Sequence, residues 1–434
     1  MKKHIFISIL LFSVYFSYGQ IVNVPDANFK NALVNTLCVD TNGDGIVDAD
    51  ADTNNDGEIQ VSEAEIVLHL NVSNHWISSL EGIQSFINLE FLNSGINVLD
   101  SIDVTQLPNL VYLNVLFNNL TALDVTQNLN LVELNCANNY FSSGLDVTQN
   151  QSLETLWCSE CWLSSIDVSQ NPNLKILDVI LNNLSSLDVT HNPNLESLYC
   201  ASNQISNLNI SQNPNLKELA CGFNELSSLN VSHNSDLEYL NVRGSNLTSV
   251  DVLENSNLEN FIASETNIIN IDLSLNHNII YVDCQNNPSL TGLNIKNGNN
   301  INMTRMLAND NPNLFCIQVD DENATYPPCI DQGYDGWCVD NWVGYSEECI
   351  LGFPSFEAIN NIQLYPNPTE NRLNIINNYN LDIYRIQIYD YQGRIILKEN
   401  SEFKTLQLSH LNKGIYLLRI ETENGILTKK IVKE

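Results

Sequence analysis

The sequence predicts a β-rich solenoid of parallel strands with little helix on its convex side, a small helical N-terminal cap and a C-terminal β-sandwich domain. Three observations carry this prediction: a phrase that returns about every 21 residues, a helical pattern ahead of its first copy, and short alternating strands behind its last. A fixed period of this length is typical of solenoids, in which each turn buries its apolar edge only against its neighbours. The 434 residues are also too many for one ordinary core.

The first residues are organised like a secretory signal peptide. Lys2 and Lys3 precede the apolar run Ile5–Phe16, and small residues then lead to Gly19. The run is too short for a permanent membrane anchor, and no later segment reaches the length of a membrane-spanning helix. We therefore expect residues 1–19 to be removed and the mature chain to be exported.

Residues 20–65 are expected to cap the first repeat, because a solenoid needs a terminal unit that covers its exposed core. Phe29, Leu33 and Val34 have the spacing of one face of a helix. The segment that follows this helix is rich in acidic and amide side chains, and it contains two candidate metal loops.

The stronger candidate, residues 52–63, reads Asp-Thr-Asn-Asn-Asp-Gly-Glu-Ile-Gln-Val-Ser-Glu. Oxygen-bearing side chains at positions one, three and five, glycine at six, an apolar residue at eight and glutamate at twelve resemble the calcium loop of the EF-hand family. The alternative is an acidic turn without metal, because Asn, Asp and Gly favour turns anyway. The resemblance implies structural calcium held by Asp52, Asn54, Asp56, Glu58 through its carbonyl, Gln60 through water, and Glu63.

The weaker candidate covers Asp40–Asp48, with possible ligands Asp40, Asn42, Asp44 and Asp48. Its twelfth position is Ala51, so the full EF-hand pattern fails. Either Asp48 or the nearby Asp52 would have to complete the ligand set. A turn that binds no metal explains this segment equally well.

Residues 66–314 carry the repeat. Residues 195–205 read Leu-Glu-Ser-Leu-Tyr-Cys-Ala-Ser-Asn-Gln-Ile, and residues 208–216 read Leu-Asn-Ile-Ser-Gln-Asn-Pro-Asn-Leu. This pattern resembles the short bacterial form of the leucine-rich repeat family. Leu198 and Cys200 alternate with outward residues at strand period, so they predict one rung of a parallel sheet on the concave side. The return leg alternates as well and predicts a second, shorter strand, which ends at the Asn-Pro-Asn turn.

Two repeat positions predict scaffold rather than function. Asn203 and its counterparts are expected to form a ladder whose amides satisfy backbone groups in the loops; the counterparts are Asn118, Asn139, Asn182 and Asn224, with breaks at Cys161, Ser245 and Thr266. A second position exchanges cysteine with valine and alanine, as expected of buried thiols that pack as small hydrophobes. Its cysteines are Cys136, Cys158, Cys200, Cys221 and Cys284.

The outward positions of the strands are the candidate binding surface. Tyrosine and tryptophan on a rigid exposed sheet are typical of interface anchors, and beside Asn and Asp they also suit sugar rings. The alternative is that these aromatics only serve β-propensity. The candidates are Tyr112, Trp157, Tyr199, Tyr239 and Tyr281, with Arg243 as the lone cation in these columns.

Residues 315–351 are expected to close the other end of the solenoid as a cysteine-rich cap. Four cysteines of an exported chain cluster here, which favours disulfide bonds. Four cysteines allow three pairings, of which we put forward Cys316–Cys349 and Cys329–Cys338.

Residues 352–362 are expected to be a linker, and the short alternating strands of residues 363–434 predict a β-sandwich. The segments Leu364–Pro368, Tyr389–Arg394, Leu408–Tyr416 and Lys429–Lys433 resemble the type A sorting domain of the type IX secretion system of Bacteroidetes. The resemblance implies Sec export followed by transport across the outer membrane, with the secretion machinery as a partner and the mature protein secreted or on the cell surface.

Charge and missing motifs narrow the function. The net charge is −33, and ten of the 18 basic residues lie after residue 362, so the rest of the chain carries the acidic excess. Such a body repels nucleic acid. The chain lacks Gly-x-Ser-x-Gly and His-Glu-x-x-His motifs, and we expect no enzyme. We expect a leucine-rich-repeat binding protein that holds an extracellular protein through its concave face; the alternatives are a glycan-binding protein and, with less support, a non-binding structural surface protein or an enzyme.

Overall fold

The computed structural model describes residues 19–330, 335–349, 362–376, 383–390, 394–399, 403–422 and 425–434. The signal peptide expected at 1–19 and the linker expected at 352–362 lie almost entirely outside these residues. The chain divides into two compact units, the first reaching residue 266 and also holding 281–283, the second holding 267–280 and 284–434. No helix in the described ranges has the length and hydropathy to cross a membrane.

The N-terminal cap is built around helix α1 (Ala27–Asn35). Asp26 caps the helix, because its Oδ1 accepts the N–H groups of Asn28 and Phe29 at 2.9 Å. Its Oδ2 accepts the backbone N–H and the hydroxyl of Ser78, at 2.9 and 2.6 Å, which fixes the helix to the first repeat. Phe29 and Leu33 are buried as expected, whereas Val34 is only half-buried and Ala32 completes the buried face. A second short helix, α2 (Val61–Ala64), and the 3₁₀ turn η1 (Ile83–Ser85) complete this end.

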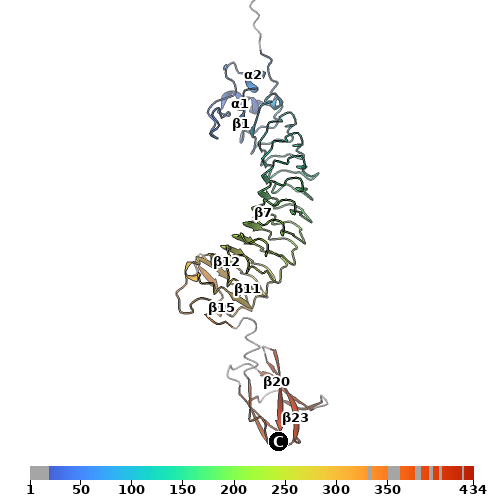
Figure 1. Ribbon diagram of the computed structural model, residues 1–434, viewed down its shortest axis with the longest axis vertical. Coiled ribbons are helices and arrows are strands. Elements are labelled where there is room, and N and C mark those ends of the chain that lie inside the picture. Colours follow the sequence, from blue (N-terminus) through green and yellow to red (C-terminus); the bar gives the residue numbers. More distant parts are fainter. Residues whose placement is uncertain are drawn as a thin grey trace, which may run out of the picture. The chain divides into compact units, whose positions relative to one another are not determined.

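A parallel sheet of very short strands runs along the first unit on the inner side of its curve (Figure 1). The central side chain of each strand is buried, and neighbours pair in one register, so that Leu92, Leu113 and Leu134 stack at the roughly 4.8 Å spacing of a sheet. The strands in order are β1 (His69–Asn71), β2 (Phe91–Asn93), β3 (Tyr112–Asn114), β4 (Glu133–Asn135), β5 (Thr155–Trp157), β6 (Ile176–Asp178), β7 (Ser197–Tyr199), β8 (Glu218–Ala220), β9 (Tyr239–Asn241), β10 (Asn260–Ile262) and β12 (Tyr281–Asp283).

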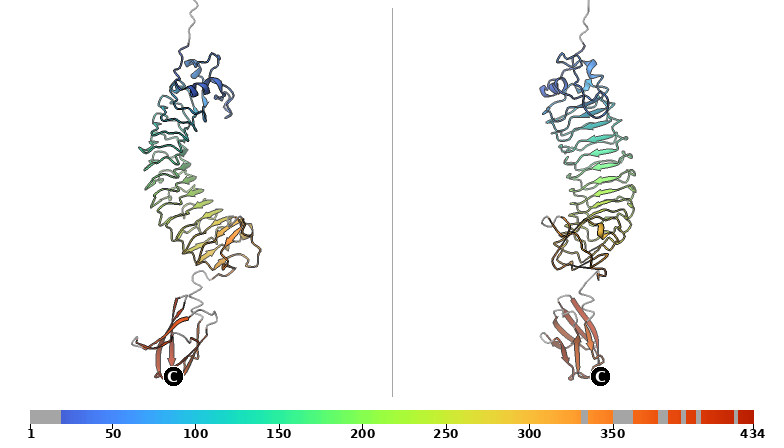
Figure 2. Two further views of the ribbon diagram at one scale, coloured as in Figure 1. Left: turned by 180° about the vertical axis from the view of Figure 1, so that it is seen from behind. Right: turned by 90° about the vertical axis from the view of Figure 1, so that its left-hand side faces the viewer.

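The return legs differ from the expected second strand. In the described part of the first unit they form no strands, as at residues 207–210. The unit curves with its sheet inside (Figure 2), so successive return legs lie farther apart than the strands and do not pair. In the second unit the return legs do pair, as a parallel sheet in the order β11 (Asn270–Asp272), β13 (Gly292–Asn294), β15 (Cys316–Gln318), β17 (Gly344–Ser346).

The predicted asparagine ladder is present. Asn182 donates from its amide to the carbonyls of Cys158 at 2.9 Å and Val179 at 3.0 Å, and its Oδ1 accepts the N–H of Leu163 at 2.9 Å. One side chain thus joins two repeats and satisfies backbone groups inside the turn. At the break in the ladder, the Cys161 thiol donates to the carbonyl of Cys136.

A second asparagine ladder, which the sequence analysis did not anticipate, lies at the Asn-Pro-Asn turns. The first asparagine of each turn is fully buried. Asn192 donates from its amide to the carbonyls of Val168 and Asn171, both at 2.9 Å, and Asn213 repeats the arrangement one turn later. This asparagine therefore does more than tolerate the turn, because it links the return legs of successive repeats.

The cysteine-rich cap of the second unit contains the disulfide bonds put forward above, Cys316–Cys349 and Cys329–Cys338. Trp337 is its aromatic centre, stacked on Tyr326 at 3.9 Å between ring centroids. The Trp337 indole donates to the carbonyl of Met303 at 3.1 Å. The cap adds strands to both sheets of this unit, because β16 (Trp337–Val339) pairs with β14 (Arg305–Ala308) and β17 pairs with β15; the 3₁₀ turn η2 (Asn300–Asn302) precedes β14.

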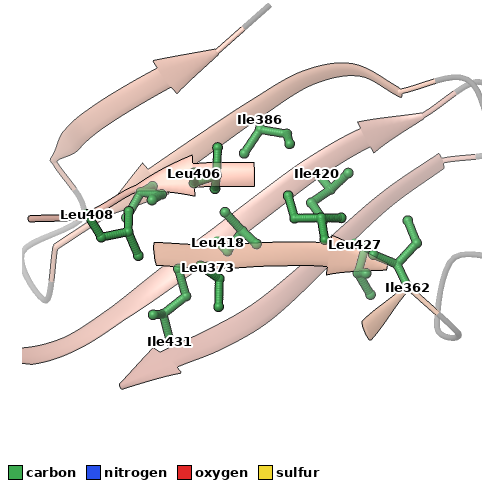
Figure 3. Close-up of a cluster of buried hydrophobic side chains, with 11 residues drawn as sticks. Ile362, Leu373, Ile386, Leu406, Leu408, Leu418, Ile420, Leu427 and Ile431 are labelled. Atoms are coloured by element: carbon green, nitrogen blue, oxygen red, sulfur yellow. The ribbon is translucent and has the colours of Figure 1, made fainter. Parts of the chain in front are cut away.

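Residues 363–434 form two antiparallel sheets that bury one common core (Figure 3). Leu373 comes from one sheet and Leu418 and Ile431 from the other, which is the expected sandwich. One sheet has the order β18 (Gln363–Tyr365), β19 (Arg372–Ile376), β22 (Thr405–Gln407), and the other has the order β21 (Ile395–Glu399), β20 (Ile383–Tyr389), β23 (Gly414–Thr422), β24 (Gly425–Lys433).

The Pro-Asn-Pro segment of this domain holds the last strand. Asn367 donates from its amide to the carbonyl of Lys430 at 2.7 Å and accepts the N–H of Val432 at 2.9 Å. Thr369 continues the pairing, because it donates its N–H to Val432 and accepts that of Glu434. The chain end is therefore fixed by residues more than sixty positions earlier.

Candidate functional site

The outward side chains of the first unit's sheet form two columns, which we call the concave face. The strands that carry them lie on the inner side of the curve (Figure 2). The first residue of each strand makes one column, and Tyr112, Tyr239 and Tyr281 lie in it. The third residue makes the other, which contains Trp157 and Tyr199. All five aromatic candidates lie on one face and are half-buried.

The amino-terminal end of the first column is a continuous aromatic strip. Phe91 and Tyr112 stack with ring centroids 4.2 Å apart and planes within 7°. His69 meets the edge of Phe91 at 6.0 Å. Burial raises the pKa of Tyr112 despite the hydrogen bond from the Asn114 amide. The phenol therefore stays neutral and can donate a hydrogen bond.

The second column contains a structural asparagine in several repeats. Asn93, Asn114 and Asn241 each accept, on Oδ1, the N–H of the residue two positions later, at 3.0–3.1 Å. The side chain closes the turn that follows the strand, so these amides are scaffold. In two repeats Trp157 and Tyr199 stand where the asparagine would be. Their rings carry no side-chain carbonyl, so the hydrogen bond that closes the turn is lost and a large aromatic side chain faces outward instead.

Acidic groups surround these two rings. The Tyr199 hydroxyl donates to the Glu218 carboxylate, and burial together with this hydrogen bond raises the pKa of Tyr199 to about 12. Burial raises the pKa of Asp178, which lies between Trp157 and Tyr199 in the column. Arg243 does not neutralise the negative charge that a ligand would meet here, because its guanidinium is paired with Glu265 at 2.6 Å.

A second exposed feature lies three residues beyond the strands. Here the backbone N–H bonds to the next repeat, as Phe117 N does to Ala137 O at 3.0 Å, and φ is positive. Asn138 tolerates this left-handed backbone, but Phe117 and Leu181 adopt it at φ 50° and 55°, at a cost of ~1–2 kcal/mol each. With exposed residues two positions further on, these side chains form what we call the loop ridge: Trp76, Ile96, Phe117, Tyr140, Trp162, Leu181 and Phe223.

A groove of about 560 Å³ lies on the loop ridge. Phe117, Tyr140, Trp162 and Leu181 supply its apolar walls, and five asparagines and Glu160 complete the lining. This groove lies outside the strand columns and was not predicted from the sequence. The available signal was a bulky residue just before the ladder asparagine, at a position where the backbone favours asparagine or glycine.

The 52–63 loop closes on itself. Asp52 accepts the N–H groups of Asp56 at 3.1 Å and Gly57 at 2.7 Å. Glu63 returns to the start of the loop, where it accepts the Thr53 hydroxyl at 2.8 Å, and it also accepts the N–H of Gln60 at 2.9 Å. Positions one and twelve are thus both buried carboxylates turned toward the loop interior. The donor set is all oxygen, which suits calcium.

The remaining predicted ligands of this loop are engaged with one another. The Asn54 amide donates to Gln60 Oε1 at 2.6 Å, and the Gln60 amide donates to Asp56 at 3.0 Å. The Glu58 carboxylate pairs with Lys30 at 2.6 Å, so only its carbonyl is left for a metal. Among the described residues, no three His, Cys, Asp or Glu side chains converge as a metal-holding group.

The 40–48 loop has the same plan in a shorter form. Asp40 accepts N–H groups from Gly43 at 2.7 Å and Gly45 at 2.8 Å. Burial raises the pKa of Asp40, but these hydrogen bonds outweigh it and hold the pKa below its ordinary value. The Asp48 carboxylate accepts the Thr41 hydroxyl at 2.8 Å, as Glu63 accepts that of Thr53, so Asp48 rather than Asp52 closes this loop.

The third and fifth positions of that loop are occupied locally. Asn42 accepts the N–H of Asp44, and Asp44 accepts that of Ile46, both at 2.9 Å. These bonds describe an ordered acidic turn whether or not a metal is bound.

The repeat cysteines are core residues. Cys136, Cys158, Cys200, Cys221 and Cys284 are free and buried, as are Cys38 and Cys161. Burial raises the pKa of Cys38 and of Cys221 to about 12, so neither thiol is ionised near neutral pH. Their place in the solenoid is structural.

Two parts of the chain, the C-terminal domain and the solenoid, are similar to known proteins. Residues 363–434 match the family of secretion system C-terminal sorting domains. This domain directs export by the type IX secretion system to the cell surface or the medium. No curated protein matches the sequence as a whole.

Solved structures match the solenoid. The functional domain of InlJ from Listeria monocytogenes, which includes a cysteine ladder, is similar with a TM-score of 0.52 and 22% identity over 96% of this chain and 98% of that one. A leucine-rich-repeat protein of Leptospira interrogans has the same score and identity over 60% of this chain and 79% of its own. These similarities show the leucine-rich-repeat fold.

Proposed function

We propose that this secreted leucine-rich-repeat protein binds an extracellular protein partner through its concave face and catalyses no reaction. The observation that carries the proposal is the exchange at Trp157 and Tyr199. Several other repeats use an asparagine there to close the turn after the strand, whereas these two repeats carry an aromatic ring at that position. Rings of this kind dominate the energetics of protein interfaces.

The charges of the face indicate the character of the partner. Asp178 and Glu218 lie beside the two rings, and the one arginine of the predicted surface is already paired. A partner with basic residues around an apolar centre complements this surface. Its association should weaken as ionic strength rises, because exposed charges are screened by salt.

The proposal is tested by capturing a partner and comparing its affinity for the wild type and for variants of the concave face. The mature chain, residues 20–434, is used to isolate partners from extracellular protein of cells in its habitat, and the partner is then titrated. Trp157→Ala and Tyr199→Ala should each weaken binding by about tenfold or more. Trp342→Ala, which removes an exposed ring from the cysteine-rich cap, is the matched control. Affinity that is equal in wild type and both concave variants would refute the proposal.

We also propose that the 52–63 loop binds one structural calcium ion. Asp52 and Glu63 are buried at the two ends of the loop, and the Glu58 side chain is held away by Lys30. Calcium should therefore stabilise the N-terminal cap, since a ligand bound only by the folded state raises the free energy of unfolding.

Calorimetry of the mature chain in calcium and in chelator tests this second proposal. Calcium should raise the unfolding temperature of the wild type, and Glu63→Gln should abolish the rise. Glu58→Gln is the control that should keep it, because position seven contributes only a carbonyl. Identical unfolding of the wild type in calcium and in chelator would contradict it.

A further inference from the structure

We propose that the groove on the loop ridge is a second binding site, and that its ligand is an extended, uncharged glycan. This site is separate from the concave face. It lies between Phe117 and Leu181 and has a volume of about 560 Å³, within the range of small-molecule binding sites.

Folding does not explain the groove walls. Phe117 and Leu181 hold bulky side chains in the left-handed backbone region, and each is about half exposed. Trp162 is 60% exposed, also at positive φ. Asn138 occupies the same repeat position as Phe117 and shows that the repeat accepts a residue suited to this backbone. A strained backbone that carries bulky, half-exposed side chains indicates a surface kept for a ligand.

The two irregularities of the central repeats coincide with the groove. The one extra residue of the array falls near Phe141, directly after Tyr140. The ladder asparagine is replaced by Cys161, directly before Trp162. Both departures from the repeat therefore lie next to an aromatic residue of the groove wall. Insertions in repeat proteins gather on the loops of the binding face.

The chemistry of the lining favours a sugar. Aromatic rings offer flat apolar faces to the C–H groups of a pyranose, while the exposed Asn119 amide and the Glu160 carboxylate can bond its hydroxyls. None of the described residues lining the groove is Lys, Arg or His, so an anionic ligand has no partner there. Successive repeats are roughly 4.8 Å apart, a step close to the length of one pyranose unit in an extended chain.

A peptide fits the groove less well. Peptides that lie along a sheet edge need unpaired backbone groups. The N–H groups of Phe117 and Leu181 are already bonded to the carbonyls of Ala137 and Ala201 in the next repeat. Asn97, Asn118 and Asn139 are engaged in the ladder. The Asn119 amide and the Tyr140 hydroxyl can both donate to and accept from sugar hydroxyls, and the Glu160 carboxylate can accept from them.

The test uses the full mature chain and five hexasaccharides: β-1,4-glucan, β-1,3-glucan, β-1,4-xylan, α-mannan and chitin. Calorimetric titration should show binding of at least one of them. Trp162→Ala and the double change Phe117→Asn with Leu181→Asn should each weaken that binding by about tenfold or more. The double variant should unfold at the same temperature as wild type or higher, because asparagine relieves the strained backbone.

Two controls separate this site from the rest of the chain. Trp76→Ala removes a ring of the same ridge outside the groove, and Tyr199→Ala alters the concave face; both should leave glycan affinity unchanged. Failure of all five sugars to bind at millimolar concentration, or wild-type affinity in both groove variants, would overturn the proposal. Capture of an apolar peptide that both groove variants lose, with no sugar bound, would overturn it in favour of a protein ligand. If Tyr199→Ala weakens binding of the protein partner but not of the glycan, the result bears on the concave face and not on the groove.

Discussion

The solenoid and the sorting domain are stabilised in different ways. In the first unit each strand buries its central residue, and two ladders of asparagine amides join repeats to their neighbours. In residues 363–434, side chains from two sheets meet in one closed core (Figure 3). The solenoid is extendable because its interactions are between neighbours, whereas the sandwich is complete at one size.

This difference explains where each region can vary. A repeat keeps its fold as long as its leucines and asparagines are present, so its outward and loop positions are free to acquire rings such as Trp157 and Trp162. The sandwich has no repeated set of outward and loop positions that can vary in this way. Four changes test this comparison, from the largest expected effect to the smallest.

Truncation of the sandwich core should unfold the sorting domain alone. Leu418 is fully buried in β23, and Leu418→Ala should lower the free energy of unfolding of that domain by about 4 kcal/mol. Leu417→Ala, next to it on the same strand and 46% exposed, should have little effect. Calorimetry of the mature chain should show loss of one transition with the solenoid transition unchanged. An equal shift of both transitions would show that the two regions do not unfold independently.

Removal of the longer disulfide should loosen the cap that closes the second unit. Cys316→Ala with Cys349→Ala opens a link across 33 residues, with an expected loss of about 3 kcal/mol. The pair Cys329→Ala with Cys338→Ala spans only nine residues and should cost less, because a shorter loop restrains the unfolded chain less. Proteolysis of the cap, followed by mass spectrometry, measures both. Equal protection of the two variants would contradict this order.

Loss of one asparagine of the second ladder should destabilise the solenoid. Asn192→Ala leaves the carbonyls of Val168 and Asn171 without their buried donor and should lower stability by about 2 kcal/mol. Asn194→Ala is the control, since that amide donates to Pro172 from an exposed position. Hydrogen exchange should increase in the repeats on either side of residue 192 and not in the sorting domain. Unchanged exchange there would show that the ladder is dispensable.

The smallest effect is expected at a repeat cysteine. Cys200→Val should change stability by no more than about 1 kcal/mol, because Val179 and Val242 occupy the same position in other repeats. Cys200→Ser should be worse, since it buries a hydroxyl in an apolar site. Chemical denaturation measures both. A large loss in Cys200→Val would give the thiol a role beyond packing.

The period, the leucines and the ladder at Asn182 were readable from the sequence, because each depends on residue type at a fixed spacing. The second ladder was not. Asn-Pro-Asn at residues 192–194 has the composition of a simple turn, and only the three-dimensional path shows that its first amide faces the core. The return legs were misjudged in the first unit for a related reason, since alternation predicts an extended chain but does not report the distance to the next one.

The candidate sites show the same limit. The concave columns could be read from strand alternation, and the register places the five aromatic residues as expected. The loop ridge was harder to recognise, because a bulky residue before the ladder asparagine is informative only once the positive φ of that position is known. The ridge becomes visible only from the positive φ of Phe117 and Leu181. The hydrogen bonds that their N–H groups make to the next repeat impose this backbone conformation.

The bracket that Asn367 makes around β24 has a consequence for folding. Asn367 and its partners, Lys430 and Val432, are 63 and 65 residues apart in the sequence. The edge that they form therefore exists only when the segments between them have folded into the sandwich. A transporter that recognises this edge would bind a folded sorting domain and would not bind an unfolded one.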